Sequence, residues 1–214
     1  MSGAISGEPS PESLRNYDYT PAWNKVMRSW ICVVCLYVAT GFMMAHSTEE
    51  PAWTLIAQLE SVGIRQYEPV IQARTLIDTE SRSSKGFRTL ADYIFGVNAK
   101  EQSIAMTAPV EEVLSDNDAY MAFTMPSQYS LDDLPEPKDS LVTLHRVPSR
   151  TMAVIQFSGW ATDAVVAEQT RILLETLDVS GWAAVSAPSL NQYNPPWIPP
   201  WNRRNEVMVQ VQGG

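Results

Sequence analysis

The sequence predicts an α+β domain that follows one N-terminal transmembrane helix. Three features support this: an uncharged apolar stretch near the N-terminus, two segments with apolar residues at helical spacing, and several short strand-like segments bounded by turn residues. In the soluble part these elements follow one another as β-α-β-β, twice. We therefore expect two similar halves that form one distorted antiparallel β-barrel or sheet with two helices packed on it.

Composition excludes several classes of protein. The chain has 214 residues, of which 45% are hydrophobic, so it is not intrinsically disordered by composition. Its net charge is −9, and its 15 Lys and Arg residues are dispersed, whereas a nucleic-acid-binding surface needs them clustered. Both cysteines, Cys32 and Cys35, lie inside the apolar stretch. There they are expected to act as small apolar residues rather than as a redox pair.

The apolar stretch Ser29–Ser47 contains no Lys, Arg, Asp or Glu and is long enough to cross a bilayer as a helix of about 20 residues. Lys25 and Arg28 precede it, and acidic residues follow it. The positive-inside rule then predicts a single-pass protein of the bacterial inner membrane, with its N-terminus in the cytoplasm and its main domain in the periplasm. A cleaved signal peptide is the alternative, but its positively charged region would be unusually long.

These features predict four segments. Residues 1–28 form a cytoplasmic arm and residues 29–47 the transmembrane helix. Residues 48–61 form a juxtamembrane linker, and residues 62–212 form the folded domain.

The first half of the domain begins with a strand over Gln66–Thr75, in which Pro69 indicates an edge or a bulge. A helix is expected over Ser83–Phe95, because apolar residues recur there at i, i+3, i+4 and i+7. Strands over Ile104–Leu114 and Ala119–Pro126 complete this half.

The second half repeats the pattern. Strands are expected over Leu141–Val147 and Thr151–Phe157, and a helix over Thr162–Leu177. Two further strands, Leu190–Asn194 and Glu206–Val211, close the domain.

The usual equipment of an enzyme is missing from the sequence. Nucleophilic catalysis needs a nucleophile next to a base, and the only histidines are His46, at the end of the apolar stretch, and His145, which is expected on the face of a strand. The chain has no G-x-S-x-G elbow, no H-x-x-x-H pair for zinc and no glycine-rich phosphate loop. We therefore expect a binding protein without a catalytic or metal site.

A proline-rich aromatic segment stands out near the C-terminus. Tyr193–Trp201 reads YNPPWIPPW and is followed by Arg203 and Arg204. Prolines at this density exclude a helix or a central strand and favour a stiff, extended loop. Such a loop either folds down over the core or forms the rim of a cleft. In the second case the two arginines would be placed to bind carboxylates of a ligand.

Several motifs resemble the SOUL haem-binding protein family. The matching stretches, in order, are YEP at 67–69, GFRTLADYIFGVN at 86–98, IAMTAPV at 104–110, FTMPSQY at 123–129, LPEP at 134–137, YNPP at 193–196 and RRNEV at 203–207. The resemblance covers residues 62–212. It implies a distorted barrel of two β-α-β-β halves that binds haem or a related porphyrin, mainly by apolar contact with the first helix and a nearby loop. The first strand and first helix contain no histidine, so no axial ligand from them is expected.

This resemblance gives a candidate site for haem or another porphyrin. The expected ring contacts are Phe87, Leu90, Ala91, Ile94, Trp197, Ile198 and Trp201. The expected partners of the propionates are Lys85, Arg203 and Arg204. For each of these residues, packing in the core or at the rim is the alternative interpretation.

Two further functions remain open at this point. The chain could be an accessory subunit of a larger membrane complex, photosynthetic or respiratory, that uses the SOUL-like domain for docking. An enzyme acting on a porphyrin is the third interpretation. The expected partners are accordingly a tetrapyrrole, the lipid bilayer through residues 29–47, and other subunits of a membrane complex, but no nucleic acid.

Overall fold

The computed structural model describes residues 48–77, 84–115 and 117–214. The predicted arm 1–28 and the predicted transmembrane segment 29–47 lie outside these residues. Within the described ranges, no helix has the length and apolar character needed to cross a membrane.

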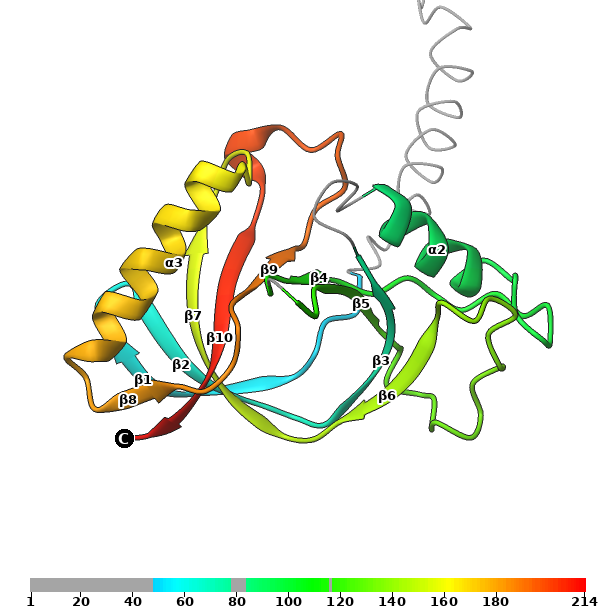
Figure 1. The fold of residues 1–214 in the computed structure, drawn as a ribbon, viewed down its shortest axis with the longest axis horizontal. Helices are drawn as coiled ribbons and strands as arrows, with labels where there is room; N and C mark the ends of the chain where they lie inside the picture. The colour runs from blue at the N-terminus through cyan, green and yellow to red at the C-terminus, as the bar shows by residue number, and fades with distance from the viewer. Residues whose placement is uncertain (1–47, 78–83, 116) are drawn as a thin grey trace, which may run out of the picture. The chain divides into compact units, whose positions relative to one another are not determined.

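Ten strands form one antiparallel sheet in the described part of the chain. In chain order they are β1 (Trp53–Leu59), β2 (Val62–Tyr67), β3 (Val70–Leu76), β4 (Val110–Val113), β5 (Tyr120–Thr124), β6 (Thr143–Val147), β7 (Arg150–Phe157), β8 (Trp182–Ala184), β9 (Ser189–Gln192) and β10 (Asn205–Gly213). In the sheet the order is β1-β2-β7-β10-β9-β4-β5-β3-β6, and β8 pairs with the end of β10. The strands curl into a half-barrel (Figure 1).

Two α-helices pack on this sheet, as the periodicity predicts. Helix α2 (Ser84–Ile94) lies against β3 and β5, and helix α3 (Asp163–Asp178) lies against β7, β8 and β10. The side chain of Thr162 accepts a hydrogen bond from the Val165 amide and caps α3. Each half of the sheet therefore has its own helix (Figure 1).

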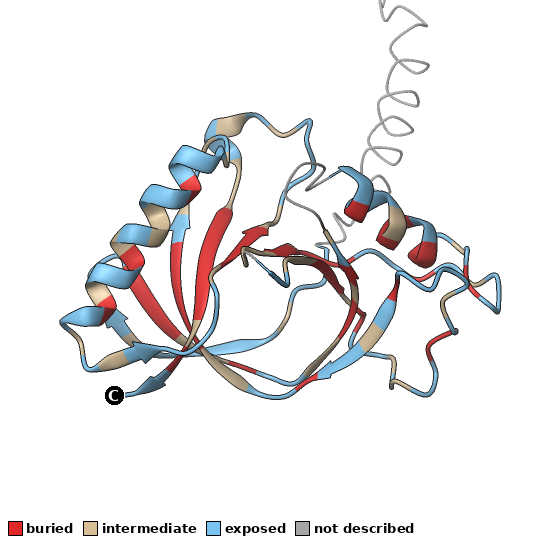
Figure 2. Cartoon of the chain, in the orientation of Figure 1, coloured by how far each residue is buried: buried red, intermediate tan, exposed pale blue. Residues whose placement is uncertain are grey.

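The helices divide the apolar interior into two cores. Under α3, Val166, Leu173 and Leu177 meet alternate residues of β2, β7 and β10, such as Ile155 and Val207. Figure 2 shows these buried stretches along the strands next to α3, and a second set beneath α2. Because side chains alternate along a strand, the residues in between point to the opposite, helix-free face of the sheet. That face holds a smaller cluster of Tyr67, Met152, Val154 and Met208.

The structure changes three expectations about the strands. The segment 48–61, expected as a linker, contains β1, which pairs along β2. The single strand expected over Gln66–Thr75 is two strands, since β2 ends at Tyr67 and β3 begins at Val70. Proline lacks an amide hydrogen and its preceding residue is restricted, so Glu68–Pro69 turns the chain from one half of the sheet to the other.

Two further differences concern short strands. The strand expected over Ile104–Leu114 is confined to β4, Val110–Val113. Strand β8 was not predicted; it has only three residues and pairs with the C-terminal end of β10. The two halves also interleave rather than stand apart, because β2 pairs with β7 and β3 pairs with β6.

Candidate functional site

Helix α2 exposes only part of its predicted porphyrin contacts. Leu90 and Ile94 are at most 1% exposed and Ala91 is buried, and all three belong to the core beneath the helix. Phe87 is 39% exposed, and its ring meets Phe123 edge-on at 5.3 Å between centroids. Of these four residues, Phe87 therefore presents the main apolar surface, and the other three hold the helix in place.

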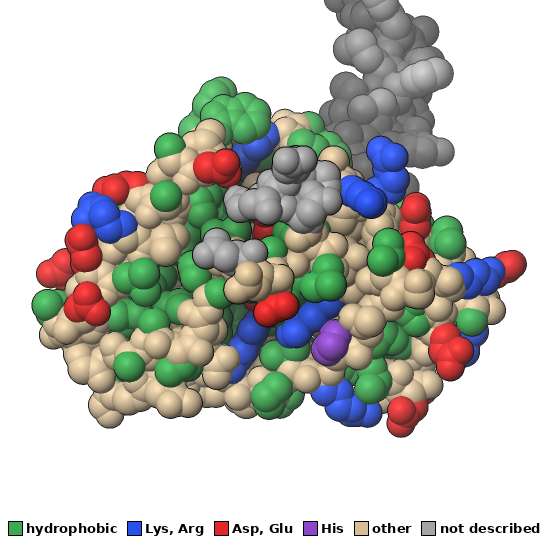
Figure 3. Space-filling view, in the orientation of Figure 1, with side chains coloured by type: hydrophobic (Ala, Val, Ile, Leu, Met, Phe, Trp, Pro, Cys, Tyr) green, Lys and Arg blue, Asp and Glu red, His purple; other side chains and the backbone are tan. Residues whose placement is uncertain are grey.

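The proline-rich loop carries the most exposed aromatic residues of the predicted set. Trp197 is 78% and Trp201 75% exposed, whereas Ile198 is half-buried. Trp201 lies in a short 3-10 helix, η1 (Pro200–Asn202), whose Pro200 carbonyl accepts from the Gly159 amide at 2.9 Å. Figure 3 shows hydrophobic side chains standing out at the end of the domain where η1 meets the start of α3. The loop is thus held by this hydrogen bond while its two tryptophans remain exposed, so it does not fold down over the core.

Arg203, predicted as a propionate partner, holds this loop together. Its Nε donates to the Ile198 carbonyl at 2.8 Å and its Nη2 donates to the Pro196 carbonyl. The guanidinium also lies 4.2 Å from the centroid of the Trp160 ring. Arg203 therefore fixes the shape of the rim.

The other two predicted propionate partners differ from each other. Arg204 stacks on Tyr193 at 3.4 Å and pairs with Glu50, and its buried Nε has no hydrogen-bond partner. Lys85 is exposed at the start of α2 and has no ion-pair partner among the described residues. Lys85 is therefore the most available of the three cations.

The helix-free face of the sheet contains a polar cluster that the sequence reasoning missed. Glu206 of β10 is almost fully buried and accepts from Arg65 at 3.1 and 3.2 Å and from the Tyr193 hydroxyl at 2.7 Å. Arg65 also donates to the Tyr67 hydroxyl at 3.3 Å. Burial, together with the nearby Glu206 charge, raises the pKa of both Tyr193 and Tyr67. The four side chains Arg65, Tyr67, Tyr193 and Glu206 bind one another within the cluster, so its role is structural.

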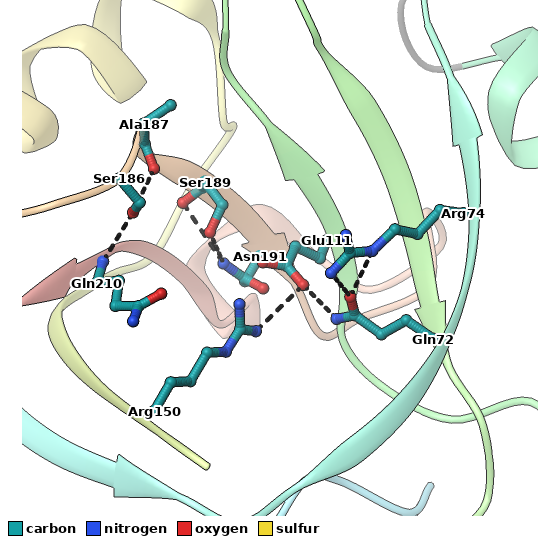
Figure 4. A network of polar contacts seen from close by, with 9 residues as sticks. All are labelled: Gln72, Arg74, Glu111, Arg150, Ser186, Ala187, Ser189, Asn191 and Gln210. Atoms are coloured by element: carbon teal, nitrogen blue, oxygen red, sulfur yellow. Dashed lines mark hydrogen bonds and ion pairs between the residues drawn. The ribbon is translucent and has the colours of Figure 1, made fainter. Parts of the chain in front are cut away.

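Figure 4 shows a second polar cluster, in which Gln72 and Arg74 of β3, Glu111 of β4 and Arg150 of β7 meet. Glu111 of β4 is buried and accepts from Gln72 Nε2 at 2.6 Å and from Arg150 Nη2 at 3.5 Å. Gln72 in turn accepts from Arg74 through Nε at 3.0 Å and Nη2 at 2.8 Å. The sequence signal for both clusters was a carboxylate within a predicted strand, at Glu111 and at Glu206.

This second cluster forms the floor of a hollow of about 460 Å³. Strands from both halves of the sheet line it, together with the loop that precedes β9. Its side chains include Arg74, Arg146, Arg150, Glu111, Asp118, Tyr120, Met152 and Gln210. In Figure 3, Lys and Arg side chains gather at the middle of the visible face, next to the purple histidine. None of the predicted porphyrin contacts lines this hollow.

Metal ligation has no support in the described part of the chain. No group of three His, Cys, Asp or Glu residues there is placed to hold a metal ion. His145 lies on β6, not on α2 or in the proline-rich loop, and its Nε2 is 2.9 Å from the Thr143 hydroxyl.

Residues 48–210 match the family model described as SOUL heme-binding protein. Human heme-binding protein 2 is 30% identical over 180 residues, which are 77% of this chain and 87% of that protein. Heme-binding protein 1 of Xenopus laevis is 29% identical over 169 residues, 72% of this chain and 87% of that protein. The match begins before β1, in agreement with the position of that strand in the sheet.

Solved structures with far lower identity share the fold. The C-terminal domain of EcmrR superposes with a TM-score of 0.55 at 10% identity, covering 72% of this chain and 98% of that one. A hydrolase from Listeria innocua gives a TM-score of 0.51 at 11% identity, covering 82% and 98% of the two chains. At such identities the similarity concerns the fold alone.

Proposed function

This chain belongs to the SOUL heme-binding protein family, and we propose that its folded domain binds haem or another porphyrin without catalysing a reaction. The observation that carries the proposal is that Phe87 on α2 and Trp197 and Trp201 in the proline-rich loop keep exposed aromatic side chains. A porphyrin is a flat apolar ring with two carboxylates, so exposed aromatic rings, with the exposed Lys85 on α2, suit it.

The residues fit a ring held by contact rather than by iron ligation. Neither α2 nor the loop from Tyr193 to Trp201 contains a histidine or cysteine. Burial of apolar surface stabilises a complex by about 25 cal/mol per Å², so several hundred Å² of porphyrin can offset the cost of association. Lys85 is the proposed propionate partner, since Arg203 and Arg204 already have partners in the fold.

The test is a titration of the full chain in mild detergent with haem, followed by absorbance. Trp201→Ala and Phe87→Ala should each weaken binding by about tenfold, which corresponds to about 1.4 kcal/mol. Trp53→Ala is the matched control, because Trp53 is a partly exposed tryptophan on β1 that lies against Arg65 and belongs to no proposed porphyrin contact. Unchanged affinity in both variants would contradict the site, and failure of the parent chain to bind any porphyrin would contradict the function.

Membrane attachment through residues 29–47 is part of this proposal. It is supported by the uncharged apolar sequence and by the basic residues Lys25 and Arg28 before it. The domain begins soon after this segment, since the Glu49 carbonyl accepts from Ala108 at 2.9 Å and Glu50 pairs with Arg204. A reporter that needs export should be active at the C-terminus; a reporter active there only in the cytoplasm would reverse the proposed topology.

A docking role in a membrane complex is the second candidate, and one observation favours it. Strand β1 is an edge of the sheet, and Trp53, Leu55 and Ile56 on it are each close to half exposed. Exposed apolar edges are common binding surfaces for other chains. Purification from native membranes in mild detergent should then yield a stoichiometric partner, which Leu55→Lys should release. A chain that purifies alone would contradict this role.

A further inference from the structure

The arginines around the hollow have far more hydrogen-bond donors than the fold uses. A guanidinium carries several N–H groups and cannot lose its charge in a protein. Arg74 uses Nε and Nη2 on Gln72, and Arg150 has one contact, to Glu111 at 3.5 Å. Arg146 is exposed and makes no hydrogen bond or ion pair with the described residues. Arg74 also lies over the Tyr120 ring at 4.5 Å, and the remaining guanidinium N–H groups have no hydrogen-bond partner among the described residues.

The cluster around Glu206 provides a comparison, because its arginine has a structural role. Arg65 and Glu206 are closely paired, and Tyr193 completes the carboxylate's contacts. Among the described residues that line the hollow, by contrast, are three arginines and two carboxylates, Glu111 and Asp118. Glu111 is already engaged by Gln72, and Asp118 is exposed at the loop before β5. The described lining therefore carries more positive than negative charge and has unused donors.

The walls of the hollow also suit the apolar part of an organic ligand. Val113, Val147, Pro148, Met152 and Ala187 contribute apolar surface between the arginines. A volume of about 460 Å³ lies within the range of small-molecule sites. A guanidinium matches a carboxylate with two parallel hydrogen bonds, and these bonds are charge-assisted.

We propose that this hollow is a second ligand site, which binds a small organic carboxylate. The carboxylate would be held by Arg146 and Arg150, with Arg74 beside them, and its apolar body would lie against Val147 and Met152. The site shares no lining residue with the proposed porphyrin surface, so the two proposals stand independently.

The test measures binding of benzoate and 2-naphthoate to the full chain in mild detergent, by calorimetry or by ligand-observed NMR. Both carboxylates should bind, 2-naphthoate more tightly, whereas naphthalene-2-carboxamide and inorganic phosphate should bind at least about tenfold more weakly. Arg146→Gln should weaken carboxylate binding by about tenfold, because one charge-assisted contact is lost. The Arg146 side chain is exposed and has no partner in the part of the chain that the structure describes, so this variant should remain folded.

Two variants make the result specific. Arg88→Gln removes the same charge from an exposed position on α2 and should leave carboxylate affinity unchanged. Ala187→Trp fills the hollow from an exposed position without changing any charge and should abolish carboxylate binding while leaving porphyrin binding intact. The proposal is overturned if no carboxylate binds at millimolar concentration, if phosphate binds equally well, or if Arg146→Gln and Ala187→Trp bind like the parent.

Discussion

Arg65 and Glu206 show how a buried ion pair acts in this fold. Their side chains are 13% and 3% exposed, so both charges are largely removed from water. Breaking such a pair leaves one charge buried without a partner, and this destabilises proteins by about 3–5 kcal/mol. We expect Arg65→Met to lower the free energy of unfolding by about 3 kcal/mol, because Tyr193 continues to donate to Glu206.

Urea denaturation followed by circular dichroism measures this change. Arg171→Met is the control, since Arg171 is exposed on α3 and pairs only with the exposed Glu168 and Glu175. Exposed pairs of this kind contribute little, so the control should shift the midpoint only slightly. Equal shifts in the two variants would show that burial of the pair at Glu206 does not matter to stability.

His145 offers a second measurement on a single side chain. Partial burial, and then the charge of Arg74, lower the pKa of His145 from 6.5. A histidine with a depressed pKa binds fewer protons in the folded state than in the unfolded state. The free energy of unfolding therefore has its full value, as far as His145 is concerned, above pH 6.5. It decreases as the pH falls from 6.5 toward the pKa of His145 in the folded state.

An NMR titration of the His145 ring checks this prediction directly. The parent should titrate below 6.5, and Arg74→Met should raise the pKa toward that value because it removes the nearby positive charge. Arg88→Met, which removes a charge from α2, is the control. A pKa above 6.5 in the parent would contradict the proposed environment.

Strand β1 sets the N-terminal boundary of the domain. It pairs with β2 from Trp53↔Tyr67 to Leu59↔Val62, and Ala57 and Leu59 pack against the core under α3. A chain that starts at residue 62 would leave β2 as an exposed edge beside that core. We therefore expect the fragment 48–214 to fold cooperatively, and the fragment 62–214 to be less stable and prone to aggregate. Identical thermal unfolding curves for the two fragments would contradict this boundary.

The positions of the helices could be predicted from the sequence, but the points where several strands begin and end could not. Regular spacing of Phe87, Leu90 and Ile94 places α2 within one residue of its observed ends. Strand β1 was missed because its sequence, WTLIAQL, does not alternate cleanly and because the preceding apolar stretch favours reading it as a linker. At Pro69 the sequence predicts an edge or a bulge rather than a turn between two strands, since one sequence cannot show that β2 and β3 pair with different strands.

The candidate sites, too, could be predicted from the sequence only in part. The proline-rich loop could be predicted, because its dense prolines exclude an α-helix and a central strand, but the sequence left open whether its tryptophans are exposed or cover the core. The arginine-lined hollow could not, since Arg74, Glu111, Arg146 and Arg150 come from β3, β4, β6 and β7 and meet only after the sheet curls. Helical spacing likewise identified Leu90 and Ile94 as one apolar face without telling whether that face meets a ligand or the core. The structure places both in the core.

The domain as a whole combines a complete core with exposed aromatic residues on α2 and in the proline-rich loop, and neither of these two segments contains a histidine. Iron should therefore add little to porphyrin binding. Leu90→Asp cannot test this, because Leu90 is fully buried and the change would disrupt the core. The decisive comparison is between ligands that differ only in the metal.

Parallel titrations of the full chain with haem and with metal-free protoporphyrin make that comparison. Both should bind, with dissociation constants within about tenfold of each other, a difference of about 1.4 kcal/mol. Trp201→Ala should weaken both ligands, and His145→Ala should change neither. A low-spin, bis-ligated haem spectrum that disappears in His145→Ala, together with loss of binding when the iron is absent, would contradict the account.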